Sequence, residues 1–159
     1  MKCIFLLPGE YRISKQPEVV ETIVGSCVTV CLYNKNNGHA AMNHFLQGYP
    51  VSETGCDIGK YGTTATEYII NALMNLDPIP GHYCAQIFGG AAVIKTTSEK
   101  AGIGQVNSDT ARKILANHRI RIIREEVGGT RGRRVRFDTS TNSVFCRFAG
   151  QVGKKYREP

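Results

Sequence analysis

The sequence predicts an α+β fold in a single domain. Short runs rich in β-branched and aromatic residues, typical of strands, recur along the chain, whereas only two stretches have apolar residues at helical spacing. Many strands combined with two helices favour the α+β class. With 159 residues, 42% of them apolar, the chain is long enough for one domain with its own core. We assign residues 1–150 to this domain and residues 151–159, which are polar, to a C-terminal tail that frays.

The predicted strands are bounded by turn-forming residues. They cover residues 3–7, 11–13, 19–24, 28–33, 39–46, 83–88, 120–126, 133–137 and 143–148. Residues 48–62 and 96–104 are predicted loops. The glycine pairs Gly89-Gly90 and Gly128-Gly129 lack the Lys-Ser/Thr and the strand–loop–helix context of a phosphate-binding loop, so we interpret both as turns.

Two helices are predicted. The first covers residues 63–76, because its apolar residues share one face of a helix and prolines follow directly: Ala65, Ile69, Ala72, Leu73 and Leu76, then Pro78 and Pro80. The second helix is expected to begin at a cap formed by Asn107 or Ser108 and to end near Asn117.

The strand over 28–33 is followed by a cluster of asparagines and Gly38, which predicts a β-hairpin. If residues 34–37 form a four-residue loop, Tyr33 pairs with Gly38 and Cys27 lies opposite His44. Directly opposed side chains share a sheet face, with Cβ atoms roughly 4.5 to 5.5 Å apart. A slip of one residue would put them on opposite faces, so this pairing depends on the loop length.

A cysteine facing a histidine is the arrangement that nucleophilic catalysis needs. The thiolate is the nucleophile, and an imidazolium beside it would lower the thiol pKa from about 8.5. Gly25-Ser26, just before Cys27, would let a substrate carbonyl approach, and backbone N–H groups there could hold an oxyanion. The alternative is that Cys27 is a buried core thiol and His44 a structural strand residue.

Several motifs carry a family resemblance that covers residues 5–148. They are Pro8-Gly9-Glu10-Tyr11, Gly25-Ser26-Cys27 with Val28-Thr29-Val30-Cys31-Leu32-Tyr33, Met42-Asn43-His44-Phe45, Lys60-Tyr61-Gly62, Phe88-Gly89-Gly90-Ala91, Ile103-Gly104-Gln105-Val106-Asn107, and Glu126-Val127-Gly128-Gly129-Thr130-Arg131 with Val135-Arg136-Phe137. In this order they closely resemble the chemoreceptor glutamine deamidases of bacterial chemotaxis, the CheD family.

The resemblance implies mixed sheets packed as a sandwich with flanking helices, a fold shared with the cytotoxic necrotizing factor toxins. It implies hydrolysis of glutamine side-chain amides in chemoreceptor helices through a Cys27 thioester, with His44 as base and no metal or cofactor. The family uses a threonine shortly before the cysteine to orient the histidine, and Thr22 is the one threonine in that stretch. Thr22 bonded only to backbone is the alternative. Asn43 and Asn107 are interpreted as structural.

The resemblance leaves two further activities open. One is methylesterase activity on glutamyl esters at the same receptor sites. The other is a regulatory adaptor role, in which the protein binds a CheC-type phosphatase, alone or in addition to deamidation.

The charge of the chain is +7, and seven arginines lie between Arg119 and Arg136. Such a stretch can bind nucleic acid, but no aromatic stacking platform or recognition-helix pattern accompanies it, so we predict no nucleic acid partner. A solvated strand face is a second interpretation. The family's Glu- and Gln-rich receptor helices favour a third, an acidic protein partner attracted electrostatically.

The cysteines and the apolar runs bear on location. No apolar run reaches the 18 or more residues of a membrane span, and the run over 3–7 is too short for a signal peptide. Six cysteines without a Cys-x-x-Cys pair predict neither a zinc site nor a disulfide framework. We therefore expect a cytoplasmic protein with free thiols and no membrane insertion, in which Cys31, Cys56, Cys84 and Cys146 are core or incidental.

Overall fold

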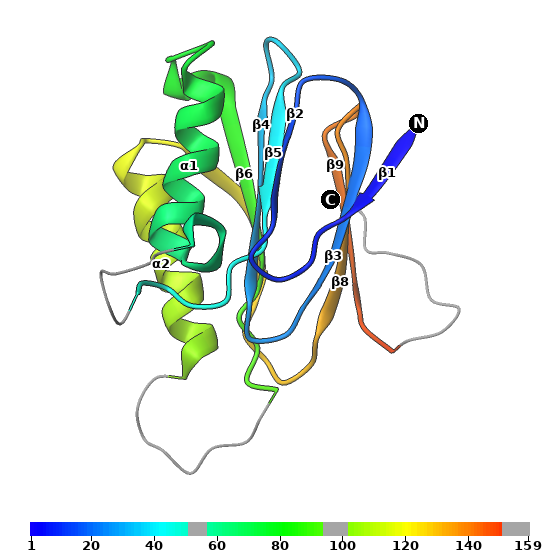
Figure 1. Ribbon diagram of the computed structural model, residues 1–159, viewed down its shortest axis with the longest axis vertical. Helices are drawn as coiled ribbons and strands as arrows, with labels where there is room; N and C mark the ends of the chain where they lie inside the picture. The colour runs from blue at the N-terminus through cyan, green and yellow to red at the C-terminus, as the bar shows by residue number, and fades with distance from the viewer. Residues whose placement is uncertain (51–56, 94–101, 151–159) are drawn as a thin grey trace.

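The computed structural model describes residues 1–50, 57–93 and 102–150, and it confirms the α+β class. Within these residues the chain forms three layers: two helices, a five-stranded sheet and a four-stranded sheet (Figure 1). The five-stranded sheet has the order β2 (Tyr11–Ser14), β5 (Ala40–Asn43), β4 (Val28–Asn34), β6 (Tyr83–Gly89) and β7 (Arg121–Val127). The four-stranded sheet has the order β1 (Lys2–Phe5), β3 (Glu18–Val24), β8 (Arg133–Asp138) and β9 (Ser143–Phe148).

Both sheets are mixed, as expected. β1 runs parallel to β3, and β6 runs parallel to β7, whereas the other neighbours are antiparallel. The helices α1 (Gly62–Met74) and α2 (Ile103–Asn117) pack on one face of the five-stranded sheet. Short 3-10 turns at Ile58–Lys60 and Pro80–His82 precede α1 and β6. The strand predictions are thus confirmed, with ends that differ by a few residues.

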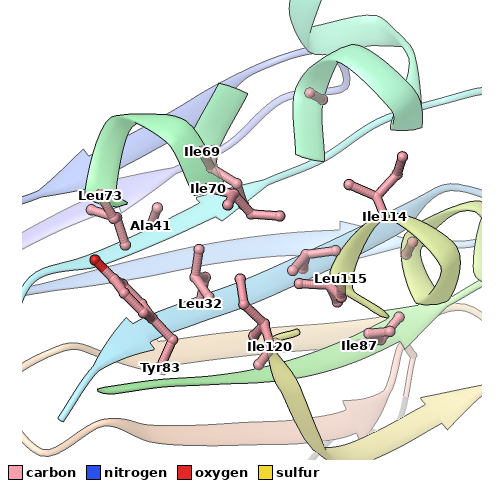
Figure 2. Close-up of a cluster of buried hydrophobic side chains, with 14 of the residues drawn as sticks. Leu32, Ala41, Ile69, Ile70, Leu73, Tyr83, Ile87, Ile114, Leu115 and Ile120 are labelled. Carbon is pink, nitrogen blue, oxygen red and sulfur yellow. The ribbon is translucent and has the colours of Figure 1, made fainter. Parts of the chain in front are cut away.

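The five-stranded sheet is covered on both faces, which explains why β4 and β6 are buried at every position rather than at alternate ones. Between this sheet and the helices lies one core cluster, to which Leu32, Ile69 and Leu115 belong (Figure 2). A second cluster between the two sheets contains Phe137 and the thiols of Cys31 and Cys146. The prediction that Cys31, Cys84 and Cys146 are core residues is confirmed.

The four-stranded sheet is covered on its inner face only, because no helix of the described chain packs on its outer side (Figure 1). Residues of β8 accordingly alternate between buried and half-buried. Ile23 of β3 is 43% exposed on the outer face, beside Arg134 and near Arg136. Of the seven clustered arginines, Arg133 instead points inward and is 7% exposed, so they do not form one surface patch.

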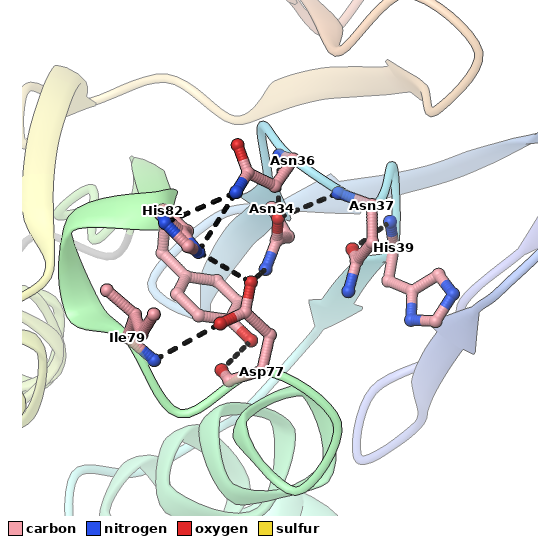
Figure 3. A network of polar contacts seen from close by, with 8 residues as sticks. Asn34, Asn36, Asn37, His39, Asp77, Ile79 and His82 are labelled. Atoms are coloured by element: carbon pink, nitrogen blue, oxygen red, sulfur yellow. Dashed lines mark hydrogen bonds and ion pairs between the residues drawn. The ribbon is translucent and has the colours of Figure 1, made fainter.

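The predicted hairpin is present, but its predicted register was wrong by two residues. Tyr33 pairs with Ala40 rather than Gly38, and Cys27 therefore does not lie directly opposite His44. The cause is Asn34, which stays in the strand and whose side-chain oxygen accepts hydrogen bonds from the N–H groups of Asn36 and Asn37 (Figure 3). The four-residue loop is thus 35–38. An even shift keeps every side chain on its predicted face.

A polar cluster fixes this end of the hairpin to the α1–β6 connection (Figure 3). The Asp77 carboxylate accepts hydrogen bonds from the Asn34 amide at 2.8 Å and pairs with the His82 ring at 2.7 Å. Two hydrogen bonds hold the pKa of Asp77 below its usual value: the one from the Asn34 amide has the larger effect, and the one with His82 adds to it. His82 and His118, which pairs with Glu67, are half-buried partners of carboxylates.

The second helix begins earlier than predicted. It starts at Ile103, with Gly102 as its N-cap, so neither Asn107 nor Ser108 caps it. Glycine at position 104 permits this start, because a Cβ there would lie 2.3 Å from the Gly90 carbonyl oxygen. The side chain of Asn107 is engaged elsewhere, and residues 102–104, predicted as loop, open the helix.

Some predictions fall on residues outside the described ranges. These are the fraying tail at 151–159, the role of Cys56 as a core or incidental residue, and residues 51–56 and 96–101 of the two predicted loops. Within the described ranges, no helix is both long and apolar enough to cross a membrane.

Candidate active site

Thr22 and His44 meet between the two sheets. Thr22 lies on β3 with its side chain directed inward, and its hydroxyl group is fully buried. The Thr22 Oγ1 atom lies 2.8 Å from the Leu6 carbonyl oxygen and 2.6 Å from His44 Nδ1. Of the two interpretations of Thr22, the one in which it bonds only to backbone is therefore wrong.

These two bonds determine the tautomer of His44. The Leu6 carbonyl can only accept a hydrogen bond, so the one hydroxyl hydrogen of Thr22 is donated to it. Thr22 Oγ1 must then accept from His44, which places the ring proton on Nδ1. The other ring nitrogen, Nε2, is left unprotonated and is free to act as a base.

The backbone of His44 is fixed by the turn that follows β1. The Gly9 N–H donates to the His44 carbonyl at 2.8 Å, and the His44 N–H donates to the Glu10 carbonyl at 3.0 Å. His44 is 2% exposed, and its Nε2 atom is buried without a hydrogen-bond partner in the described chain. A buried polar atom without a hydrogen-bond partner lowers the stability of the fold by about 1 to 3 kcal/mol. Because such atoms are rare in native structures and often have a catalytic role, this one indicates a function.

Cys27 lies in the turn that joins β3 to β4 and is partly exposed. An isolated bridge pairs Val28 with Phe45, so Cys27 and His44 are diagonal neighbours on one face of the strand pair. Diagonal neighbours are roughly 7 to 8 Å apart, with their Cβ atoms somewhat closer, which is within reach of a cysteine and a histidine side chain. In the described chain no hydrogen bond joins the thiol to the ring.

A cavity of about 340 Å³ lies beside the turn that contains Cys27. Its wall includes Ser26 and is formed largely by small residues of the turn after β6, the start of α2 and the turn before β8, which are Gly90, Ala91, Ala92, Gly102, Gly104, Gly128 and Gly129. The sequence predicted turns at Gly89-Gly90 and Gly128-Gly129 and a loop over 96–104, but not the cavity that these segments line. The concentration of glycine in three separated motifs is the signal that could have found it.

Burial shifts both titrating groups toward their neutral forms. It raises the pKa of the Cys27 thiol, an effect that the Cys27 backbone N–H partly offsets. Burial lowers the pKa of His44 to about 4, and the negative charge of Glu10 opposes this. The expectation that an imidazolium lowers the thiol pKa is therefore wrong for this state, in which the pair is neutral at pH 7.

The low pKa of His44 predicts acid sensitivity of the fold. Between pH 6.5 and 4 the unfolded chain binds a proton at this histidine and the folded chain does not, so stability falls as the pH is lowered. At about 1.4 kcal/mol per pH unit the loss approaches about 3 kcal/mol. Urea unfolding at pH 7 and pH 4.5 measures it. His44→Gln should lose less stability over this interval than wild type; an equal loss would contradict the assignment.

Comparisons with known proteins identify the family of this chain. The family model described as CheD chemotactic sensory transduction matches residues 50–148. The chain is 36% identical over 152 residues to the probable chemoreceptor glutamine deamidase CheD 1 of Geobacter sulfurreducens, covering 91% of this chain and 76% of that one. It is 35% identical to the probable chemoreceptor glutamine deamidase CheD 2 of Shewanella oneidensis, covering 98% of this chain and 79% of that one.

The Shewanella match covers enough of the chain to include the stretch with Thr22, Cys27 and His44, which the family-model match does not. Among solved structures, Neisseria meningitidis protein NMB0706, of the family model DUF152, is similar with a TM-score of 0.49 and 8% identity. That match covers 81% of this chain and 64% of the Neisseria chain, so this chain spans less than two thirds of its length.

Proposed function

Since this chain belongs to the CheD family, we propose that it is a protein-glutamine deamidase that converts specific chemoreceptor glutamines to glutamate. The observation that carries the proposal is the bond from His44 Nδ1 to Thr22. It leaves Nε2 as an orphaned base on the same sheet face as the Cys27 thiol. A nucleophile, a base and a group that orients the base are the parts needed for acyl transfer through a covalent intermediate.

In the first half of the reaction, the Cys27 sulfur attacks the carbon of the glutamine carboxamide, and His44 Nε2 takes the thiol proton. Because the resting pair is neutral, proton transfer accompanies attack rather than preceding it. The imidazolium keeps its Nδ1–H bond to Thr22. It then gives its Nε2 proton to the departing nitrogen, so that ammonia leaves and a thioester remains.

In the second half, water attacks the thioester carbon while Nε2 accepts a proton from the water. The carbon–sulfur bond breaks, the thiol regains its proton, and the substrate residue is now glutamate. The net reaction consumes one water and releases one ammonia for each glutamine. Each step uses residues of this chain, and the absence of a cofactor requirement stays a prediction.

The receptor is proposed to bind near the outer face of the four-stranded sheet. Arg134 and Arg136 lie there with side chains 36% and 43% exposed, and Glu21 between them offsets only part of their charge. β3, which carries Ile23 on this face, leads directly into the turn that contains Cys27. Basic residues there suit acidic receptor helices through electrostatic steering.

Reversing the two charges should weaken receptor recognition without changing the chemistry. For Arg134→Glu with Arg136→Glu we expect kcat/KM on a receptor fragment to fall about tenfold at low salt, with kcat unchanged, since exposed charges act on association. The matched control is Lys113→Glu with Arg121→Glu, the same charge change on α2 and β7. Equal losses in both double variants, or a loss that persists at about 1 M salt, would contradict a specific surface.

The proposed function is tested by ammonia release from a purified receptor cytoplasmic fragment. Wild type should release ammonia, and Cys27→Ala should not. If wild type releases none but changes the activity of a CheC-type phosphatase, the adaptor role replaces the deamidase.

The proposal includes a cytoplasmic location for this protein. The receptor helices proposed as substrate belong to the cytoplasmic part of the receptor, and the described cysteines are free thiols.

A further inference from the structure

The nucleophile turn has three consecutive carbonyl groups that are all tied into the protein interior. The Gly25 carbonyl accepts a hydrogen bond from the Ala91 N–H at 2.9 Å, and the Cys27 carbonyl accepts one from the Gly90 N–H at 2.9 Å. Between them, the Ser26 carbonyl accepts from the side-chain amide of Asn107 at 2.9 Å. All three donors come from the turn after β6 or from α2, so the carbonyls point in that direction.

The N–H groups of the same peptide units must then point away from those donors. The described residues contain no cis peptide bond, and in a planar trans peptide the N–H is opposed to the preceding carbonyl. The Val28 N–H, third in the series, donates to the Phe45 carbonyl at 3.1 Å. Those of Ser26 and Cys27 have no hydrogen-bond partner in another described residue. The Cys27 N–H lies beside its own sulfur.

Asn107 ties the two sides of the site together. It is fully buried in the second turn of α2, and its amide donates both to the Ser26 carbonyl and to the Leu46 carbonyl, each at 2.9 Å. Ser26 precedes the nucleophile, and Leu46 follows the base His44 by two residues. One amide group thus fixes the turn with the sulfur relative to the strand with the imidazole.

Close backbone packing makes this arrangement possible. A Cβ on Gly89 would lie 2.2 Å from the Cys27 carbonyl oxygen, and one on Gly90 would lie 2.7 Å from the Gly104 carbonyl oxygen. Glycine at these positions lets the turn after β6 approach both the nucleophile turn and the start of α2. The hydrogen bonds to the carbonyls of Gly25, Ser26 and Cys27 therefore belong to a rigid, close-packed unit.

We propose that the backbone N–H groups of Ser26 and Cys27 form the oxyanion hole and that Asn107 is the positioning residue that holds them in place. When the Cys27 sulfur bonds to the substrate carbon, the carboxamide oxygen becomes an oxyanion one bond from that carbon, on the side of these N–H groups. Preorganised donors aimed at such an oxygen stabilise the tetrahedral intermediate. This inference rests on the proposed function, because it names how that reaction is stabilised.

The test separates oxyanion stabilisation from activation of the thiol. For Asn107→Ala we expect kcat on a receptor fragment to fall about 10²-fold, with KM changing much less, because donors to an oxyanion act in the transition state. Alkylation of Cys27 by iodoacetamide, followed by peptide mass spectrometry, should stay within about threefold of wild type. Displacement at a saturated carbon forms no oxyanion, so it needs the thiol and the base but not the hole.

Asn34→Ala is the matched control. Asn34, the last residue of β4, is also fully buried, and its amide likewise donates a hydrogen bond, in this case to Asp77 (Figure 3). The Asn34→Ala variant should be less stable than wild type, as expected when a buried, hydrogen-bonded asparagine is replaced, but it should keep the wild-type kcat. If Asn107→Ala does not fold, Asn107→Ser is used, whose hydroxyl can donate to one of the two carbonyls, and an intermediate kcat is expected.

Two results would overturn the inference while leaving the deamidase intact. One is a wild-type kcat in the Asn107 variant of an active enzyme. The other is a parallel fall of kcat and Cys27 alkylation, which would assign Asn107 to general packing. A wild-type protein that releases no ammonia would overturn the proposed function, and this inference with it.

Discussion

Replacing Cys27 with alanine is expected to lower the rate of receptor deamidation by at least about 10⁴-fold. Loss of the nucleophile removes the covalent intermediate, and direct attack by water on a carboxamide is far slower than attack by a positioned thiol. The turn itself should persist, because its carbonyls are held by Gly90, Ala91 and Asn107 rather than by the thiol. Ammonia release from the receptor cytoplasmic fragment is the measurement.

Cys31→Ala is the matched control for this variant. Cys31 lies on β4, on the same face as Cys27, and is fully buried in the cluster between the sheets. Burial raises the pKa of its thiol far above the neutral range, so it cannot supply a thiolate. Its truncation should reduce stability and leave kcat within about twofold of wild type. Retained activity in Cys27→Ala, or its loss in Cys31→Ala alone, would rule out Cys27 as nucleophile.

Thr22→Val should lower kcat by about 10² to 10³-fold with little change in KM. Valine fills the same space, but it cannot accept the proton of His44 Nδ1, which is then buried without a partner. The ring loses the interaction that selects the Nδ1–H tautomer and supports the imidazolium formed during attack. In serine hydrolases the loss of the corresponding carboxylate costs about 10⁴-fold, and a neutral hydroxyl contributes less.

Two variants decide whether the hydroxyl or the packing of Thr22 matters. Thr22→Ser keeps the hydroxyl and should recover most of kcat. Thr66→Val removes a hydroxyl from another fully buried threonine, on α1 beyond the five-stranded sheet, and should keep kcat. Thr22→Val with wild-type kcat would mean that His44 needs no orienting partner.

The elements of the fold were predictable because each has a local cause. The strands end at asparagine, glycine and proline, and α1 has an apolar stripe that the core uses. The hairpin register was not predictable, because the pattern Asn34-Lys35-Asn36-Asn37 does not determine which asparagine ends the strand. The side-chain bonds of Asn34 to the next two N–H groups decide it. The start of α2 was missed because glycines that permit close packing resemble loop glycines in sequence.

The site was predictable in part. The face shared by Cys27 and His44 follows from strand alternation, which survives a shift of two residues. The bond between Thr22 and His44 joins two different sheets, so no local pattern encodes it, and the sequence connected them only through a family resemblance. The shifted pKa values of the pair depend on burial, which is a property of the whole fold.

Peptide mass spectrometry of a receptor cytoplasmic fragment, incubated with the purified protein in ¹⁸O-labelled water, tests the central claim most directly. The account predicts that specific glutamines become glutamates carrying the heavy oxygen, with wild type and with Cys31→Ala, but not with Cys27→Ala. Receptor glutamines that stay unmodified with active, folded wild type, or that are converted equally by Cys27→Ala, would contradict it.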